Sequence, residues 1–162
     1  MSVNRMRVKG TPAEVFAILA DPYTYEHWVV GCVDIRAVEG EWPAVGSLFH
    51  HTVGMGPFKV KDNTKVLDVD ADTRLVIEAR ARPAGVAEVV FTLTPVPEGT
   101  EVCIQEYAVR GFAHRIANPV LDFLVHLRNA ETLRRLDKQV EQGAGKARTG
   151  PPPSGSPERP PA

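Results

Sequence analysis

The sequence predicts an α+β fold in which one curved antiparallel sheet of seven strands wraps around a long C-terminal helix. Apolar and polar residues alternate with a period of two between Val33 and Val109. A long helical pattern follows from Asn118 onward. Two short helical segments precede the alternating region, after a single N-terminal strand. The expected order is therefore strand, two short helices, six strands and one long helix.

The N-terminal elements have clear local signals. Val3–Val8 alternates as a strand does, and the stretch TPAEVFAILADP follows it. Thr11 is a good helix N-cap, Pro12 suits the first helical position, and Glu14 lies three residues after the cap. These residues predict a helix that begins with a capping box. The next stretch, YTYEHWV, predicts a second short helix between the first strand and the second.

Five turn signals divide the alternating region into six strands. They lie at residues 40–44, 54–57, 70–73, 83–85 and 97–100. Because the strands follow one another at short intervals, we expect an antiparallel meander. If the turn at 54–57 closes its hairpin, Phe49 lies opposite Asp62 and His51 opposite Val60. His51 and Asp62 are then diagonal neighbours, about 7–8 Å apart at the backbone.

The C-terminal helix is expected to begin at the Asn118-Pro119 pair and to end near Gln142, after an earlier turn from Phe112. Its first half is apolar nearly all round, with Val120, Leu121, Phe123, Leu124, Val125 and Leu127. Such a helix must be covered on two sides. Packing within the domain is the first interpretation, and contact with a second copy or a ligand remains open.

Length and composition indicate one domain with a tail. The chain has 162 residues, of which 43% are hydrophobic, enough for one core over residues 1–142. Residues 143–162 are rich in Gly, Pro and Ser and are expected to be a disordered, dispensable tail.

Several classes of function are disfavoured. The net charge of −1 does not favour a nucleic-acid or anionic-membrane partner. The N-terminus lacks the apolar run of a signal peptide, and no stretch of about 18 apolar residues could span a membrane. A cytoplasmic protein is the resulting expectation. Cys32 and Cys103 form no CxxC pair, and the His50-His51 pair has no third ligand at metal spacing, so we expect no metal. The chain contains no phosphate-binding or dinucleotide motif, so we expect no cofactor.

The inward face of the predicted sheet indicates a hollow. Strand parity places small residues there, namely Ala79, Ala81, Ala87 and Ala108, and also Phe49, Phe58 and Phe91. The same face carries His51, Asp62 and Glu106, and parity would also turn Arg110 inward. Protein interiors otherwise fill to crystal-like density, so small residues beside polar ones favour a partly wet cavity between sheet and helix.

Four segments together resemble a known family. They are TPAEVFAILADPYTYEHWV, WPAVGSLFHHTVGMGPFKVKDNTKV, GTEVCIQEYAVRG and NPVLDFLVHLRNAETLRRL. They resemble the polyketide cyclase/dehydrase and lipid-transport branch of the START-like helix-grip (SRPBCC) superfamily over about residues 1–141. The resemblance implies a seven-stranded sheet that grips the C-terminal helix around a hydrophobic ligand cavity. No single catalytic motif unites the family, so the resemblance implies no catalytic residue.

Three residues are candidates for catalysis. His51 held by the Asp62 carboxylate would be a general base at neutral pH. The alternative is a structural buried pair. Glu106, expected opposite Phe91 among apolar neighbours, could act as an acid through desolvation. Its alternatives are a solvated position at the cavity mouth and a salt bridge to the long helix.

The candidate ligand-binding residues are Phe49, Ala79, Phe91, Asn129, Arg110 and Trp28. Asn129 lies on the helix stripe that is expected to face the sheet, where it could bond a ligand carbonyl or cap a buried backbone group. Trp28 is expected to be a lid or a part of the core rather than a ring that stacks on a cofactor. Two functions remain open. One is an enzyme that enolises, cyclises or dehydrates a hydrophobic, poly-oxygenated substrate, like a polyketide cyclase. The other is a non-catalytic carrier or sensor of a lipid-like ligand. With either function the protein is expected to be a monomer or a homodimer.

Overall fold

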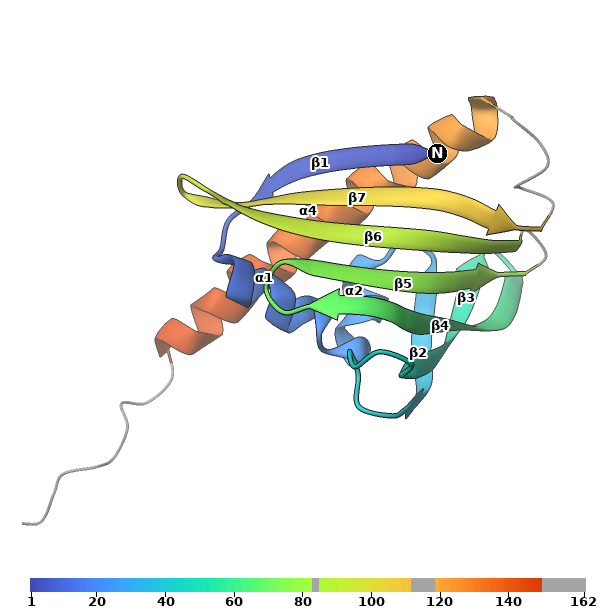
Figure 1. Cartoon of the computed structure of the whole chain (residues 1–162), viewed down its shortest axis with the longest axis horizontal. Coiled ribbons are helices and arrows are strands. Elements are labelled where there is room, and N and C mark those ends of the chain that lie inside the picture. The colour runs from blue at the N-terminus through green and yellow to red at the C-terminus, as the bar shows by residue number, and fades with distance from the viewer. Residues whose placement is uncertain (83–84, 112–118, 150–162) are drawn as a thin grey trace, which may run out of the picture.

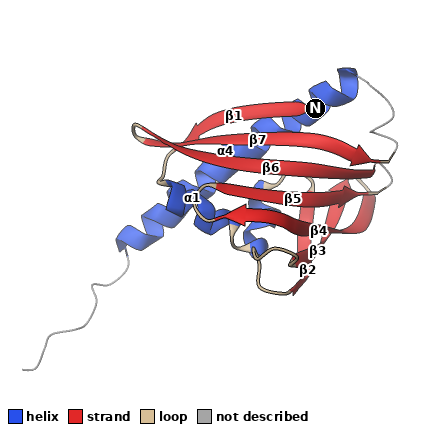
Figure 2. Cartoon of the chain, in the orientation of Figure 1, coloured by secondary structure: helices blue, strands red, loops and turns tan. Residues whose placement is uncertain are grey.

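The computed structural model describes residues 1–82, 85–111 and 119–149. Seven strands form one antiparallel sheet in the order β1-β7-β6-β5-β4-β3-β2, drawn in red in Figure 2. The strands are β1 (Ser2–Val8), β2 (Cys32–Glu39), β3 (Leu48–Met55), β4 (Phe58–Asp70), β5 (Arg74–Ala81), β6 (Gly85–Val96) and β7 (Gly99–Arg110). The helices are α1 (Pro12–Leu19), the 3-10 helix η1 (Pro22–Thr24), α2 (Tyr25–Trp28) and α4 (Pro119–Thr149). The predicted fold class is confirmed.

The sheet is a meander that the N-terminus completes. Strands β2 to β7 each pair with the next strand in the chain, and β1 pairs with β7 at one edge. Helix α4 crosses one face of the sheet, while α1 and α2 lie on that same face (Figure 1). The helices therefore cover one face of the sheet, which we call the inner face.

The capping box of α1 is present as predicted. The Thr11 hydroxyl accepts a hydrogen bond from the Glu14 N–H at 3.3 Å, and the Glu14 carboxylate accepts from the Thr11 N–H at 2.8 Å. Both bonds use backbone donors that the helix itself leaves unpaired. The start of this helix is therefore fixed by local chemistry, which explains why the sequence predicted it.

The core lies between the inner sheet face, α1, α2 and the second half of α4. Its largest fully buried side chains include Leu19, Trp28, Leu75, Ile104, Leu133 and Leu136. In the part of the chain that the structure describes, no helix combines the length and the apolar character needed to cross a membrane.

Helix α4 is longer than predicted. It continues past the predicted end near Gln142 to Thr149. Of the residues from 143 to 149, the two alanines, the lysine and the arginine are strong helix formers. The remaining tail, part of the turn at 83–85 and the turn from Phe112 lie outside the described residues.

The first half of α4 carries an exposed apolar stripe. Val120, Phe123, Leu124 and Leu127 are exposed, at 63%, 59%, 55% and 50%. Their spacing of three and four residues places them on one side of the helix. Packing on two sides within the described domain is therefore not found. Figure 1 shows the reason, because the first turns of α4 extend beyond the N-terminal end of β1.

Two strand registers differ from the prediction by two residues. The β3–β4 turn is the two-residue Gly56-Pro57, so His51 lies directly opposite Asp62, and Phe49 lies opposite Thr64. The side chain of Phe58, expected inward, is 76% exposed at the end of this hairpin. Across β6 and β7, Glu106 lies opposite Val89, whereas Phe91 lies opposite Ile104.

A bulge in β7 corrects the expected position of Arg110. Ala87 pairs with Ala108, whereas Val86 pairs with Arg110, so Val109 is an extra residue in the ladder. The bulge reverses the parity of the strand end. The Arg110 guanidinium consequently lies on the outer face, where it donates to the Glu78 carboxylate at 2.8 Å.

Candidate ligand-binding site

A cavity of about 130 Å³ lies between the inner face of the sheet, the α2–β2 connection and α4. Its lining residues are Tyr25, Trp28, Val29, Val30, Gly31, Cys32, Phe49, His51, Val53, Thr64, Ile77, Ala79, Arg80, Ala87, Val89, Phe91, Ile104, Glu106, Arg128, Asn129 and Thr132. Seven of the nine residues singled out in the sequence border it: Trp28, Phe49, His51, Ala79, Phe91, Glu106 and Asn129. The other two, Asp62 and Arg110, do not border it.

Small side chains leave this space open. Ala79 on β5 pairs directly with Ala87 on β6, so two methyl groups stand where larger residues would meet. Ile77 and Val89 form the next inward pair along the same two strands. The floor of the cavity is therefore aliphatic, and its side chains are smallest at the pair of Ala79 and Ala87.

Aromatic rings form one wall. Four of them border the cavity: Tyr25, Trp28, Phe49 and Phe91. The ring centroids of Tyr25 and Trp28 lie 4.6 Å apart. The Tyr25 hydroxyl donates to the Leu19 carbonyl at 2.9 Å, and the Trp28 indole donates to the Thr24 hydroxyl at 3.1 Å. Burial raises the pKa of Tyr25. Since their polar atoms are already bonded elsewhere, these two rings offer a ligand mainly apolar surface.

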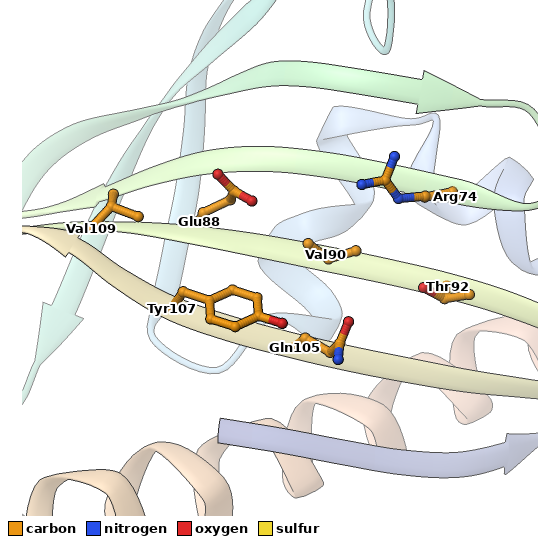
Figure 3. A pocket seen from close by; sticks show the side chains of 7 residues that line it. All are labelled: Arg74, Glu88, Val90, Thr92, Gln105, Tyr107 and Val109. Atoms are coloured by element: carbon orange, nitrogen blue, oxygen red, sulfur yellow. The ribbon is translucent and has the colours of Figure 1, made fainter. Parts of the chain in front are cut away.

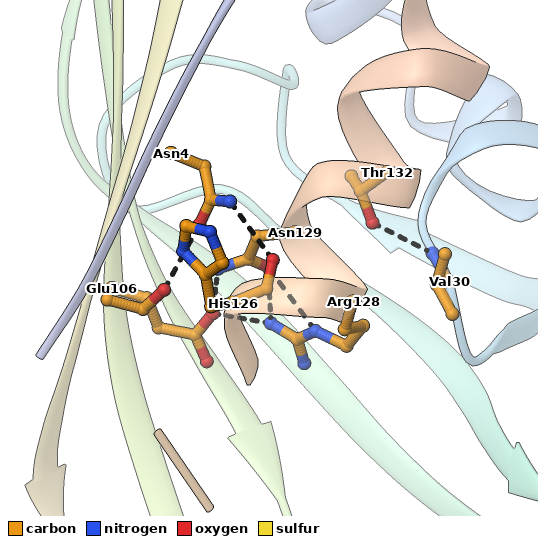
Figure 4. A network of polar contacts seen from close by, with 8 residues as sticks. Asn4, Val30, Glu106, His126, Arg128, Asn129 and Thr132 are labelled. Carbon is orange, nitrogen blue, oxygen red and sulfur yellow. Dashed lines mark hydrogen bonds and ion pairs between the residues drawn. The ribbon is translucent and has the colours of Figure 1, made fainter. Parts of the chain in front are cut away.

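The helix side of the cavity carries a polar cluster of Glu106, Arg128 and Asn129 (Figure 4). One oxygen of Glu106 accepts from the Asn129 side-chain amide at 3.0 Å and also from the Arg128 guanidinium. Arg128 donates to the Asn129 side-chain oxygen at 3.0 Å as well. The Glu106 side chain is 12% exposed and that of Arg128 is 41% exposed. Glu106 thus makes the salt bridge to the long helix that the sequence left open as an alternative.

Arg128 is the residue that the sequence reading missed. It directly precedes Asn129, and its guanidinium spans from the Asn129 side chain to Glu106. A helix stripe identifies residues whose side chains face the sheet, but a long arginine beside the stripe can still reach inward. The sequence did contain one indication of Arg128. Glu106 was predicted to be an inward carboxylate with no assigned partner, and such a group favours a positively charged side chain nearby.

Two further bonds hold α4 over the cavity (Figure 4). The Thr132 hydroxyl accepts from the Val30 backbone N–H at 3.2 Å, which ties α4 to the segment after α2. The Asn4 side chain on β1 donates to the His126 carbonyl at 3.0 Å. The helix is therefore fastened on both sides of the polar cluster.

The sheet side of the cavity carries His51 and Thr64. The His51 Nε2 atom lies 3.1 Å from the Thr64 hydroxyl, and His51 is only 7% exposed. Burial lowers the pKa of His51, and it outweighs the Asp62 charge and a backbone hydrogen bond with Asn63, both of which raise that pKa. The imidazole is consequently neutral at neutral pH and able to accept a proton.

Asp62 lies behind the cavity wall. Its side chain is 0% exposed. One carboxylate oxygen accepts from the Arg82 backbone N–H at 2.8 Å. The other oxygen lies 3.5 Å from the Arg82 guanidinium but has no hydrogen-bond partner among the residues that the structure describes. The expectation that Asp62 faces a wet pocket is therefore wrong, because its carboxylate is sealed against the neighbouring strand end.

A larger but open hollow of about 410 Å³ lies on the opposite face of the sheet (Figure 3). It is lined by Arg74, Glu88, Val90, Thr92, Gln105, Tyr107 and Val109. Ligand sites usually enclose most of the ligand surface, which an open sheet face does not do. We therefore regard the inner cavity as the better candidate despite its smaller volume.

The described residues around the cavity form neither a metal-binding cluster nor a reactive thiol. Within residues 1–82, 85–111 and 119–149, no three His, Cys, Asp or Glu side chains cluster as a metal site requires. Cys32 borders the cavity, where burial raises the pKa of its thiol to about 11. A protonated thiol is a weak nucleophile, so Cys32 contributes packing rather than chemistry at neutral pH.

Solved structures share this architecture at low sequence identity. A conserved protein from Geobacillus kaustophilus is 21% identical, with a TM-score of 0.69 over 87% of this chain and 95% of its own. A protein from Chromobacterium violaceum is 18% identical, with a TM-score of 0.67 over 86% and 96%. The di-domain ARO/CYC StfQ from the steffimycin biosynthetic pathway is 13% identical, with a TM-score of 0.67 over 88% and 51%. At these identities the likeness shows the fold alone.

Sequence comparison goes further than structural likeness. No match was found among curated proteins. The family described as polyketide cyclase/dehydrase and lipid transport matches residues 2–141, which include every strand and the helix residues that line the cavity. The chain therefore belongs to the polyketide cyclase/dehydrase and lipid transport family.

Proposed function

We propose that this chain binds a hydrophobic or amphipathic small molecule in the cavity between the sheet and α4. The supporting observation is the distribution of its lining. Aromatic and aliphatic walls surround two polar places, His51 with Thr64 on the sheet and the Glu106–Arg128–Asn129 cluster beside the helix. A ligand with an apolar body and a polar group matches this distribution.

His51 favours catalysis as a second candidate function. A neutral imidazole at a cavity wall can remove a proton from a carbon next to a carbonyl. The donors of Arg128 and Asn129 would stabilise the negative charge that then develops on the carbonyl oxygen. This chemistry serves enolisation, aldol cyclisation and dehydration, as in a polyketide cyclase or dehydratase. Because Arg128 and Asn129 both donate to Glu106, we assign that carboxylate the role of orienting them.

Non-catalytic transport or sensing is the alternative. In that case the same polar groups only hold the ligand in one orientation, and His51 takes no proton. Only the catalytic function requires a neutral His51 that accepts a proton. Substitution of His51 therefore distinguishes an enzyme from a carrier. His51→Gln should abolish turnover of a bound molecule in an enzyme, while it should leave the affinity of a carrier within about threefold.

Native mass spectrometry of protein purified from its own host tests the binding proposal. We expect a small molecule to accompany the wild-type chain and to be lost from Ala87→Leu, which fills the cavity at the alanine pair. Thr94→Leu is the matched control, because it adds bulk at an exposed position on the same strand. Equal ligand occupancy in both variants would contradict the proposed site.

A further inference from the structure

We propose that the ligand of this cavity is a neutral molecule about the size of one ring that carries a hydroxyl or carbonyl group. The inference rests on the proposed binding function and narrows it. It excludes ionised ligands and multi-ring compounds from full enclosure in the cavity. Three features of the described lining carry it: volume, charge balance and the number of free hydrogen-bonding groups.

The volume limits the ligand to about one ring. The cavity measures about 130 Å³. An apolar cavity of about 150 Å³ holds one benzene molecule, whereas drug-sized ligands occupy roughly 300–1,000 Å³. A fused two-ring or three-ring compound therefore exceeds the available space.

The walls resist expansion because they belong to the core. Trp28 is 0% exposed, Ile104 is 1% exposed and Phe91 is 3% exposed. The Trp28 and Phe91 ring centroids lie 6.0 Å apart, and the Tyr25 and Phe49 centroids lie 4.9 Å apart. Moving one of these rings outward disturbs close-packed neighbours. The small volume is thus a property of the packed fold.

The charges on the inner side of the sheet cancel at the cavity. Glu106 and Arg128 form an ion pair, and His51 is held neutral by burial. Arg80 also borders the cavity, but its guanidinium lies on the outer side of the strand, 3.9 Å from a Glu78 carboxylate that also pairs with Arg110. An ionised ligand would find no uncompensated partner charge there, and burying an unpaired charge is strongly unfavourable. A neutral ligand avoids this cost.

The polar groups that remain suit a single oxygen function. An asparagine amide has two N–H donors, and Asn129 uses one of them for Glu106. On the opposite side, His51 and Thr64 form a hydrogen bond with each other, and together they can form one more with a polar group of the ligand. In the aromatic wall, the Tyr25 hydroxyl already donates to the Leu19 carbonyl and the Trp28 indole to the Thr24 hydroxyl. A phenol-like or ketone-like oxygen is therefore sufficient to satisfy the site.

Isothermal titration calorimetry with phenol, 1-naphthol and benzoate at pH 7 tests the inference. For the wild-type chain we expect saturable binding of phenol, with 1-naphthol and benzoate each at least tenfold weaker. Ile77→Ala enlarges the cavity floor and should reverse the order of phenol and 1-naphthol. Val76→Ala is the matched control, because Val76 is equally buried on the same strand but does not line the cavity.

The possible outcomes separate this inference from the proposed function. If 1-naphthol binds the wild-type chain as tightly as phenol, the size limit is wrong although binding stands. Tighter binding of benzoate than of phenol overturns neutrality in the same way. If none of the three binds either the wild type or a folded Ile77→Ala chain, both the inference and the binding proposal fail. Circular dichroism establishes that the variants are folded.

Discussion

Asp62 on β4 and Glu106 on β7 are both inward carboxylates, yet only Glu106 meets the cavity. Glu106 lies under α4, where Arg128 and Asn129 from a distant part of the chain donate to it. Asp62 lies near the end of the neighbouring strand, where the Arg82 backbone N–H is its donor. The first carboxylate is held by side chains that also line the ligand site, and the second is held by the sheet.

The difference shows that strand parity alone does not identify a functional residue. Parity places a side chain on one face, but the element that covers that face decides what the side chain contacts. Where α4 crosses the sheet, an inward polar group meets the cavity and the polar residues of the helix. Where the sheet ends beside Arg82, the same kind of group becomes sealed. Asp62 should therefore serve stability, and Glu106 should serve the ligand.

The largest expected effect is on the stability contributed by Asp62. Asp62→Ala removes the acceptor of the Arg82 N–H and leaves a buried gap, so the free energy of unfolding should fall by about 2 kcal/mol. Phenol affinity of the folded variant should stay within about twofold. Urea denaturation and calorimetry measure the two quantities. Asp68→Ala is the control, because Asp68 is an exposed carboxylate on the same strand. A tenfold loss of affinity with unchanged stability would place Asp62 in the ligand site after all.

A smaller effect, on selectivity, is expected for Glu106. Glu106→Gln keeps the shape of the side chain but leaves the Arg128 charge uncompensated at the cavity. The ratio of benzoate to phenol affinity should rise about tenfold, which corresponds to roughly 1.4 kcal/mol. The unfolding free energy should change by less than about 1 kcal/mol, because Arg128 is partly solvated. An unchanged affinity ratio in calorimetry would show that this ion pair does not set the charge of the site.

The smallest effect concerns the pH dependence of stability through His51. Its pKa in the folded chain is lowered by burial, so the unfolded chain binds the proton first as pH falls. Stability should be full above the ordinary histidine value of about 6.5 and should decline as pH drops below it. His51→Gln should flatten this decline. His50→Gln should retain it, because His50 pairs with Glu39 outside the cavity. Denaturant melts between pH 5 and 8 measure the unfolding free energy at each pH. If that free energy declined equally in both variants as pH falls, the burial of His51 would be contradicted.

Local signals made much of the fold predictable. The capping box at Thr11 and the start of the long helix at Pro119 depend on neighbours in sequence, and both were placed correctly. Register depends on the length of a turn. Gly56 and Pro57 close the β3–β4 hairpin alone, whereas the residues from Gly54 onward fit a longer turn equally well. Because the turn is shorter than predicted, His51 lies directly opposite Asp62 and not diagonal to it.

The site was predictable only in part, because it depends on contacts between distant elements. Ala79, Ala87 and His51 followed from parity. Ala108 was also expected inward but is exposed, and the bulge at Val109 reversed Arg110, since valine fits either face of a strand. Arg128 lies beside the inward stripe of α4, so its reach to Glu106 requires knowing where the helix crosses the sheet. Such distances are set by tertiary packing and have no counterpart in local sequence.

Chemical-shift mapping with phenol on methyl-labelled protein tests most directly whether the inner cavity is the ligand site. We predict that the methyl groups of Ala79 and Ala87 and the side-chain amide of Asn129 shift most, since all three border the cavity. The methyls of Val90 and Val109, in the hollow on the outer face, should hardly move. Shifts concentrated at Val90 and Val109, with Ala79 and Ala87 unchanged, would contradict the assignment.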